Sequence, residues 1–181
     1  MSRFAIVCGG VRSGKSAFAL AWARAAGQSR AFIATAQPTD LEMRERIARH
    51  IDERRGEFVT IEAPFDLAAA VATAREVDVI VIDCLTLWLS NLLVRGEGEQ
   101  GIARDVETLL AAIGSAPFHT ILVTNEVGMG VVPESALGRS FRDVAGRAHQ
   151  RMAAAAHELY FAMMGCILRL RPGPVGIEAP P

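Results

Sequence analysis

The segment Gly9-Gly10-Val11-Arg12-Ser13-Gly14-Lys15-Ser16 decides the fold class of this chain. It matches the pattern G-x-x-x-x-G-K-[S/T] in full. The apolar run from Phe4 to Cys8 precedes it, and an alanine-rich stretch from Ser16 to Ala26 follows it and stops at Gly27. A strand, a glycine loop and a helix in this order are the context that a phosphate-binding loop needs. We therefore predict that residues 9–16 bind the phosphates of a nucleoside triphosphate.

Each residue type in this loop has a physical task. Glycines let the backbone wrap so that its N–H groups point at phosphate oxygens, and the helix that begins near Ser16 adds the positive end of its dipole. Lys15 supplies a mobile cation, and the Ser16 hydroxyl can ligate Mg²⁺. The alternative, a glycine-rich turn that contains Lys-Ser by chance, is disfavoured by the flanking pattern.

The rest of the chain alternates between short apolar runs and amphipathic or alanine-rich stretches. We expect strands at 4–8, 31–34, 58–61, 77–82 and 120–124, helices at 16–26, 42–54, 67–74, 85–93, 102–113 and 142–157, and a hairpin of 158–163 with 166–170. Continuous apolar strands that alternate with helices indicate a mostly parallel sheet with helices on both faces. The predicted fold is α/β, P-loop NTPase-like (RecA-like), with a C-terminal hairpin. We expect one domain over residues 1–181, with 172–181 as a frayed tail.

Asp83 ends the most strand-like segment, which begins at Val77. A carboxylate at the carboxyl end of a buried strand lies at the edge of the sheet where the phosphate loop lies, so Asp83 is the candidate partner of Ser16 for a metal ion or the nucleotide. The alternative is that Asp83 caps the helix expected from Leu85. Asp78, at the start of the same strand, lies at the opposite edge.

A cationic helix face is expected between Glu42 and Arg54. Glu42, Arg46, His50 and Arg54 recur every four residues, and Met43, Ile47 and Ile51 form the adjacent apolar stripe. The spacing alone suits a solvated face with a Glu42–Arg46 ion pair and a half-buried histidine. The same spacing also allows this helix face to lie against phosphate groups, with the neutral imidazole of His50 acting as a nucleophile.

Composition narrows the classes of partner. The chain has 19 basic and 20 acidic residues and a net charge of -1, a balance that argues against nucleic-acid or anionic-membrane binding. Cys8, Cys84 and Cys166 stand in apolar runs without zinc or disulfide spacing, so we expect reduced core residues. No apolar run reaches about 18 residues and no signal-peptide pattern precedes the first strand, so we expect a cytoplasmic protein without membrane insertion.

Several segments together resemble one enzyme family. The chain resembles the bifunctional adenosylcobinamide kinase / adenosylcobinamide-phosphate guanylyltransferases of cobalamin biosynthesis from Phe4 to about Leu170. The phosphate loop is shared widely, whereas T-N-E-V-G-x-G-x-V-P followed by F-R-D-x-x-G-R is specific. The segments that carry the resemblance are residues 9–16, Glu42-Met43 with Arg46-Ile47 and residues 50–54, residues 83–86 through 91–93, residues 123–133, and Phe141-Arg142-Asp143 with Gly146-Arg147 and Gln150.

The resemblance implies two reactions. The family phosphorylates adenosylcobinamide with ATP or GTP, and then transfers GMP from GTP to adenosylcobinamide phosphate through a guanylyl-histidine, releasing pyrophosphate. Carried onto this chain, the resemblance makes His50 the nucleophile, so that His50 and Lys15 are the candidate catalytic residues. It also implies Mg²⁺ and a homotrimer.

Further nucleotide-contacting positions follow from the resemblance. They are Ala34, Thr35, Ala36, Ile51, Asp52, Glu53, Arg54, Glu62 and Asp83. Glu62 or Asp83 could accept hydrogen bonds from the guanine edge, which would favour GTP over ATP. Family members often carry glutamate at the position of Asp83, so the side chain here is one methylene shorter and its reach to a metal ion or base differs. They often carry asparagine at the position of His149, to which we assign no catalytic role.

Other interpretations stay open at this point. A P-loop kinase of a small molecule without nucleotidyl transfer, or a nucleotide-dependent regulatory switch, would also need the phosphate loop and Asp83. For Arg142, Asp143 and Arg147, a salt-bridged helix start competes with binding of the phosphorylated acceptor.

Overall fold

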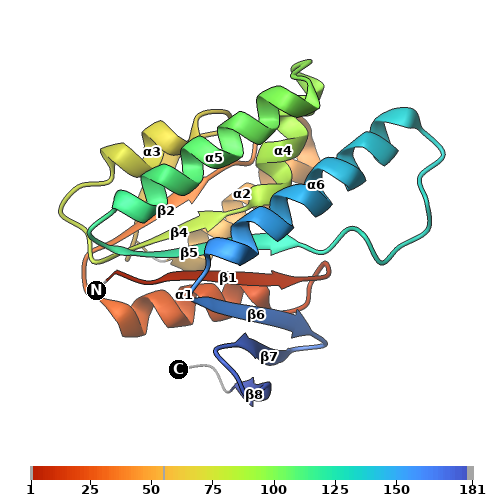
Figure 1. Ribbon diagram of the computed structural model, residues 1–181. Coiled ribbons are helices and arrows are strands. Elements are labelled where there is room, and N and C mark those ends of the chain that lie inside the picture. The colour runs from red at the N-terminus through yellow and green to blue at the C-terminus, as the bar shows by residue number, and fades with distance from the viewer. Residues whose placement is uncertain (1, 55, 179–181) are drawn as a thin grey trace.

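The sheet of this protein has one long parallel part and a short antiparallel edge. The computed structural model describes residues 2–54 and 56–178 and is drawn in Figure 1. Its eight strands run in the order β3-β2-β4-β5-β1-β6-β7-β8. Neighbours from β3 through β6 pair in parallel, whereas β7 pairs antiparallel with β6, and β8 with β7.

The strands follow the apolar runs of the sequence. Their bounds are β1 Phe4–Gly9, β2 Arg30–Ala34, β3 Val59–Glu62, β4 Val79–Asp83, β5 His119–Asn125, β6 Glu158–Met163, β7 Cys166–Arg171 and β8 Gly176–Glu178. β4 and β5 are buried along nearly their whole length, as strands covered on both faces must be. This burial confirms the mostly parallel α/β fold that the alternating pattern predicts.

Helices cover both faces of the sheet. Their bounds are α1 Lys15–Ala26, α2 Leu41–Arg54, α3 Leu67–Thr73, α4 Leu85–Val94, α5 Glu99–Ser115 and α6 Ala136–Ala155. Figure 1 shows α3, α4, α5 and α6 stacked over one face and α1 on the opposite face. One apolar core lies between the sheet and the helices α3, α4, α5 and α6, and a second core lies between the sheet and α1. α2 belongs to the α1 side, because Arg54 at its end stacks on Phe32 of the second core.

The last part of the chain differs from its prediction. Residues 176–178 lie in the segment expected to be a frayed tail, yet they form β8 and pair with β7. The prediction was wrong there because Pro172 and Pro174 suggested an irregular end, whereas the strand begins just beyond them. The rest of that predicted tail, residues 179–181, lies outside the described residues.

Two helices begin earlier than predicted. α6 starts at Ala136 rather than at residue 142, because Ser135 caps it by accepting a hydrogen bond from the Gly138 N–H. α5 starts at Glu99 rather than at residue 102, within a polar stretch that has no apolar periodicity. The first turn of α6 contains Gly138, a weak helix former, so its start is indicated by the Ser135 cap and not by apolar periodicity.

The cysteines are only partly as expected. All three are free thiols, and Cys84 is buried, but Cys8 is half-buried and Cys166 is exposed on β7. Burial raises the pKa of the Cys8 and Cys84 thiols to about 11, which keeps them in the unreactive thiol form. In the described part of the chain, no helix combines the length and the apolar character needed to cross a membrane.

Candidate active site

The phosphate loop stands between β1 and α1, as its sequence context predicts. Gly14 has a φ of 97°, a left-handed conformation that favours glycine, and it is the residue that caps α1. The next residue, Lys15, is buried, and its Nζ donates to the Gly10 carbonyl oxygen at 2.9 Å. Lys15 thus folds back over the loop, in position to face any phosphate that the loop N–H groups hold.

Ser16 and Asp83 meet at the carboxyl edge of the sheet. The Ser16 hydroxyl donates to Oδ2 of Asp83 at 3.0 Å, so the side chain of Asp83 reaches the loop. The N-cap of α4 is Cys84, whose side chain makes no capping hydrogen bond to the helix backbone, so the structure does not support the capping role for Asp83. Asp78 accepts from the N–H groups of Gln28 and Ser29 at the opposite edge, as predicted.

α2 forms one wall of a cleft beside this loop. The cleft has a volume of about 160 Å³ and is lined by Lys15, Ser16, Phe32, Ala34, Ala36, Pro38, Met43, Arg46, Ile47, His50, Ile51, Arg54, Thr60, Glu62, Asp83, Cys84, Leu87 and Asn125. Among the described residues of α2 only Arg54 is buried. The helix therefore contributes little to the core and mainly presents side chains to the cleft. His50 is half-buried there, with 34% of its side chain exposed.

The cleft holds the carboxylates of Asp83 and Glu62 among several basic side chains, and Asp83 is the acid that meets the phosphate loop. Burial raises the pKa of Asp83, and the Ser16 hydrogen bond and the charges of His50, Lys15 and Arg46 counteract that rise. Burial lowers the pKa of Lys15, and Asp83 counteracts it. Arg46 and His50 line the same cleft as Lys15, Ser16 and Asp83, so this face of α2 borders the cleft that the phosphate loop also borders. The Glu42–Arg46 ion pair of the solvated interpretation is not among the ion pairs of the described residues.

The structure brings about half of the predicted site residues into the cleft. Lys15, Ser16, Ala34, Ala36, His50, Ile51, Arg54, Glu62 and Asp83 line it. Residues 9–14 form the loop beside it, with Val11 largely exposed. Thr35 is fully buried and its hydroxyl bridges the Cys84 N–H and carbonyl, so it joins β2 to β4 rather than facing the cleft. Asp52 and Glu53 are exposed and stand outside the lining.

Strand register explains three of the lining positions. Ala34 is paired with Glu62 on one side and with Asp83 on the other, so the three lie in one row across β3, β2 and β4. Phe32 and Thr60 form the next row on the same face, because side chains alternate along a strand. Arg54 fills the space above that row, with its Cζ 4.0 Å from the Phe32 ring centre and Nη2 donating to the Thr60 hydroxyl at 3.2 Å.

Phe32 and Thr60 were missed from the sequence, although they stand two residues before Ala34 and Glu62. That two-residue spacing would have found them once the outer positions were assigned to the site. Arg46 and Met43 share the helical spacing of His50 and were noticed only as parts of an amphipathic face. Asn125 and Leu87 enter the lining from β5 and α4, with no comparable signal.

The family-specific segment after β5 is a braced loop at the same edge of the sheet. The Glu126 N–H donates to the Gly9 carbonyl at 3.0 Å, and the Glu126 carboxylate accepts from the Gly128 and Met129 N–H groups at 2.7 and 2.9 Å. Arg142, which lies well inside α6, donates to the Gly128 carbonyl at 2.7 Å. This loop is therefore fixed to the phosphate loop, and Arg142 serves as its brace rather than as part of a salt-bridged helix start.

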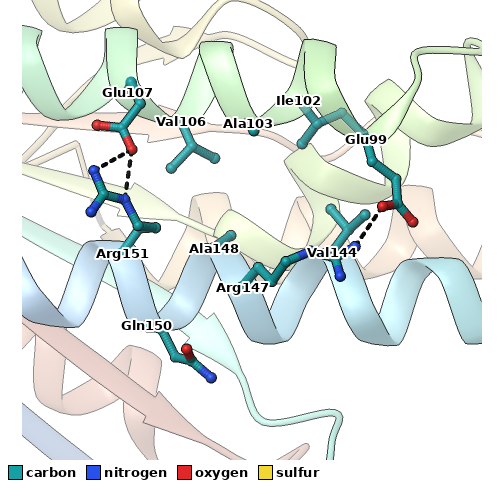
Figure 2. Close-up of a pocket in the computed structure, with 10 residues that line it drawn as sticks. All are labelled: Glu99, Ile102, Ala103, Val106, Glu107, Val144, Arg147, Ala148, Gln150 and Arg151. Carbon is teal, nitrogen blue, oxygen red and sulfur yellow. Dashed lines mark hydrogen bonds and ion pairs between the residues drawn. The ribbon is translucent and has the colours of Figure 1, made fainter.

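Arg147 belongs to a different surface, the groove between α5 and α6 shown in Figure 2. It pairs with Glu99 at 2.7 Å, and one turn further along Arg151 pairs with Glu107 at 2.6 Å. Ile102, Val106 and Val144 line the groove between the two pairs. The salt-bridged interpretation therefore holds for Arg147, although within a helix–helix contact and not at a helix start. In the described residues Asp143 makes no ion pair.

His149, which differs from the family pattern, lies away from the cleft. Its Nε2 is 2.7 Å from the Thr124 hydroxyl, and burial lowers the pKa of the imidazole. It contributes to packing between α6 and β5.

A glycine loop between β1 and α1, a carboxylate at the end of β4 and a parallel sheet with a 3-2-4-5-1 strand order define a RecA-like P-loop NTPase. Two solved structures are similar in fold. A KaiC-like protein from Pyrococcus horikoshii has a TM-score of 0.51 at 14% identity, covering 98% of this chain and 89% of that one. The RadB recombinase has a TM-score of 0.52 at 14% identity, covering 99% and 83%.

Residues 5–170 match the family described as cobinamide kinase / cobinamide phosphate guanyltransferase, and the chain belongs to this family. Two relatives carry the names of bifunctional adenosylcobalamin biosynthesis proteins. CobP of Pseudomonas aeruginosa is 40% identical over 94% of this chain and 98% of its own length. CobU of Salmonella typhimurium is 40% identical over 92% and 98%, respectively. The resemblance of the sequence motifs to this family is thereby confirmed.

Proposed function

We propose that this protein phosphorylates adenosylcobinamide with ATP or GTP and then transfers GMP from GTP to adenosylcobinamide phosphate, releasing pyrophosphate. Membership of the family and the names of its bifunctional relatives support this proposal. The observation that carries it is that His50 lines the same cleft as Lys15 and Ser16 of the phosphate loop. One bound triphosphate would thus have a cation near its terminal phosphate and a nucleophile on the other wall.

The phosphoryl-transfer half would depend on position and charge. The N–H groups of residues 9–16 would hold the phosphates, and Lys15 would neutralise charge that develops on the transferred group. Lys15 would leave its present contact with the Gly10 carbonyl and turn to the phosphate oxygens. No covalent intermediate is needed for this step.

Ser16 and Asp83 fit a Mg²⁺ ion. Their oxygens are 3.0 Å apart at one point of the cleft, and Mg²⁺ prefers oxygen ligands in small number, completed by phosphates and water. Within the described residues, no three His, Cys, Asp or Glu side chains gather to hold a metal by themselves, so the ion would arrive with the nucleotide. When bound, Mg²⁺ would offset negative charge on the phosphates.

The nucleotidyl-transfer half would use His50. Its imidazole would attack the α-phosphorus and form a phosphoramidate, which the phosphate of the acceptor would later attack. Arg46 stands on the same helix face one turn earlier and would offset phosphate charge during both steps. The remaining proposed contacts, from Thr35, Asp52 and Glu53, lack a position in the cleft lining.

Guanine recognition is better assigned to Glu62 than to Asp83. Asp83 already bonds Ser16 at the metal position, whereas Glu62 is an exposed carboxylate at the end of the outer strand β3 and lines the cleft. A carboxylate accepts the two adjacent N–H donors of guanine, which adenine does not present. We expect Glu62→Gln to weaken the preference for GTP in the second reaction.

Incubation with α-labelled GTP tests the proposal. The expected result is a protein-bound label that is stable in alkali, labile in acid and absent in His50→Ala. A wild-type protein without label, or an equally labelled His50→Ala, would contradict the role of His50. Product chromatography then separates a kinase-only enzyme, which yields phosphorylated acceptor alone, from the two-step enzyme. A regulatory switch would show no affinity for adenosylcobinamide in calorimetry.

We also propose that the enzyme works in the cytoplasm and, as the family resemblance implies, as a homotrimer. A trimer of this 19.4 kDa chain would have a mass of about 58 kDa in light scattering. A monomer mass at micromolar concentration would contradict the trimer.

A further inference from the structure

Glu53 makes a contact that the proposed reaction does not yet use. Its Oε2 is 3.1 Å from Nδ1 of His50, one helical turn away on α2. The carboxylate does not line the cleft, although His50 does. Glu53 thus contacts the imidazole of His50 without itself lining the cleft.

This contact determines which nitrogen of the His50 ring carries the electron pair that can attack phosphorus. A carboxylate oxygen only accepts hydrogen bonds, so Nδ1 is the nitrogen that carries a proton. In neutral imidazole the other nitrogen, Nε2, then holds the free electron pair. A ring with the opposite tautomer would turn a lone pair toward the carboxylate.

We infer that Glu53 is a positioning residue that orients His50 and presents its Nε2 to the α-phosphorus. This inference rests on the proposed guanylyl transfer through His50. Because both residues belong to one helix and are three positions apart, their contact is kept wherever α2 lies relative to the phosphate loop. The backbone at Glu53 is itself held, since Arg24 of α1 donates to its carbonyl at 3.3 Å and pairs with Glu57 at 2.7 Å.

The carboxylate also suits the charge changes of the reaction. The Nε2 electron pair forms a bond to the α-phosphorus, and the bond from that phosphorus to the bridging oxygen breaks, with its electron pair leaving on pyrophosphate. The ring then carries a proton on Nδ1 and phosphorus on Nε2, and is positively charged beside Glu53. When an acceptor phosphate oxygen attacks the phosphorus, Nε2 recovers its electron pair and leaves as neutral imidazole. No proton has to move in either step.

Arg49, four residues before Glu53 on this helix, is the natural competing partner, but its Nε donates to the Glu45 carbonyl oxygen at 3.4 Å. Arg54, the next residue, is also occupied elsewhere. Its guanidinium stacks on Phe32 and bonds Thr60. Of the other cations, Arg46 lines the cleft, which the Glu53 carboxylate does not, and Lys15 donates to the Gly10 carbonyl oxygen. His50 is therefore the group that the Glu53 carboxylate contacts among these.

The test is a single-turnover measurement of guanylyl-protein formation with α-labelled GTP in wild type, Glu53→Gln, Glu53→Ala and Glu45→Gln. Glu45→Gln is the matched control, because it removes one charge from an exposed position of the same helix. We expect both Glu53 variants to form the guanylyl-protein about tenfold more slowly, the low end of the effect of removing the outer partner of a functional histidine. Glu45→Gln should match wild type.

A second measurement identifies the linked nitrogen. Periodate cleavage and elimination of the nucleoside leave phosphohistidine, which chromatography compares with Nδ1 and Nε2 standards. We expect the Nε2 isomer in wild type and a share of the Nδ1 isomer in Glu53→Ala. The far-ultraviolet circular dichroism spectrum and the urea denaturation midpoint of each variant, compared with those of wild type, report that the variant is folded.

The outcomes separate the inference from the function on which it rests. An unlabelled wild type contradicts guanylyl transfer itself. A labelled wild type with the Nδ1 isomer, or with equal rates in Glu53→Gln and Glu45→Gln, overturns the role of Glu53 alone. If the circular dichroism spectrum shows that Glu53→Ala is misfolded, the isosteric Glu53→Gln still decides the rate comparison.

Discussion

At the scale of single residues, Asp83 is proposed to bind the metal ion, but its buried carboxylate lowers the stability of the protein without nucleotide. Burial raises its pKa above the ordinary 3.8, so the folded state holds the proton more tightly than the unfolded chain does. The stability contributed by this group is therefore present below pH 3.8 and declines as pH rises through the window above it. As the pH rises through that window, the carboxyl group of the empty site ionises in surroundings where burial disfavours its charge.

We expect Asp83→Asn to be at least as stable as wild type near pH 8 without nucleotide, and to lose this advantage toward pH 4. Asparagine keeps an oxygen that can accept from Ser16 and removes the charge. Metal-dependent phosphoryl transfer should fall by about 10²-fold or more, because the ion loses its charged ligand. Urea denaturation at several pH values checks the first part. A variant that is less stable than wild type at pH 8 would contradict it.

The sequence identified the chemical groups of the site better than their arrangement. The pattern G-x-x-x-x-G-K-S was enough to place Lys15 and Ser16, and the end of an apolar run was enough to place Asp83. The role of Thr35 in joining two strands was not foreseeable, because a threonine after a strand can face a ligand or a neighbouring backbone with equal ease. The contact between His50 and Glu53 depends on the rotamers of both side chains, which sequence spacing does not determine.

At the scale of elements, Gly9 is required by the approach of β6 to β1. A Cβ at this position would lie 2.3 Å from the Ala162 carbonyl oxygen and 2.8 Å from the Ser13 hydroxyl oxygen. We expect Gly9→Ala to lower the free energy of unfolding by about 1–3 kcal/mol, as overpacking does, and to weaken nucleotide binding through the displaced loop. Gly10→Ala is the control for stability, since no atom lies within 4 Å of its added Cβ. Equal denaturation midpoints for the two variants would refute the argument.

The α5–α6 ion pairs lead to a prediction about the acceptor. More than half of the Arg147 and Arg151 side chains is exposed, so each pair contributes little to stability. We expect Arg147→Ala and Arg151→Ala each to lower the free energy of unfolding by at most about 1 kcal/mol and to leave the KM for adenosylcobinamide phosphate unchanged. A KM that rises in Arg147→Ala but not in Arg151→Ala would show that Arg147 binds the acceptor after all.

Element boundaries were predictable where burial produces a pattern and not elsewhere. β4 and β5 were found because strands covered on both faces are continuously apolar. The first turn of α5 was missed because it is polar, and that of α6 because it contains Gly138 and depends on Ser135 as its cap. β8 escaped detection since a three-residue edge strand beside two prolines has no periodicity to read.

At the scale of the whole molecule, the site exists only where separate layers meet. The phosphate loop comes from β1 and α1, Asp83 from β4, Glu62 from the outer strand β3, and His50 from a helix that is hardly buried. The parallel sheet order predicts that the ends of β1 and β4 share an edge. It does not predict how closely α2 stands to that edge, because α2 has little apolar surface to fix its position.

Nucleotide binding should therefore stabilise the whole fold through the phosphate loop more than through α2. With Mg²⁺ and GTP at about 100 times the dissociation constant, we expect about 2.7 kcal/mol of added stability, or about 5–10 °C in Tm for a chain of this size. Lys15→Ala should lose most of this shift, because its buried ammonium would face the phosphates. His50→Ala should keep most of it, since the loop N–H groups remain. Differential scanning fluorimetry with matched concentrations measures all three proteins. A shift lost in His50→Ala and kept in Lys15→Ala would mean that the nucleotide is held mainly by α2, and that the phosphate loop is not the main binding element.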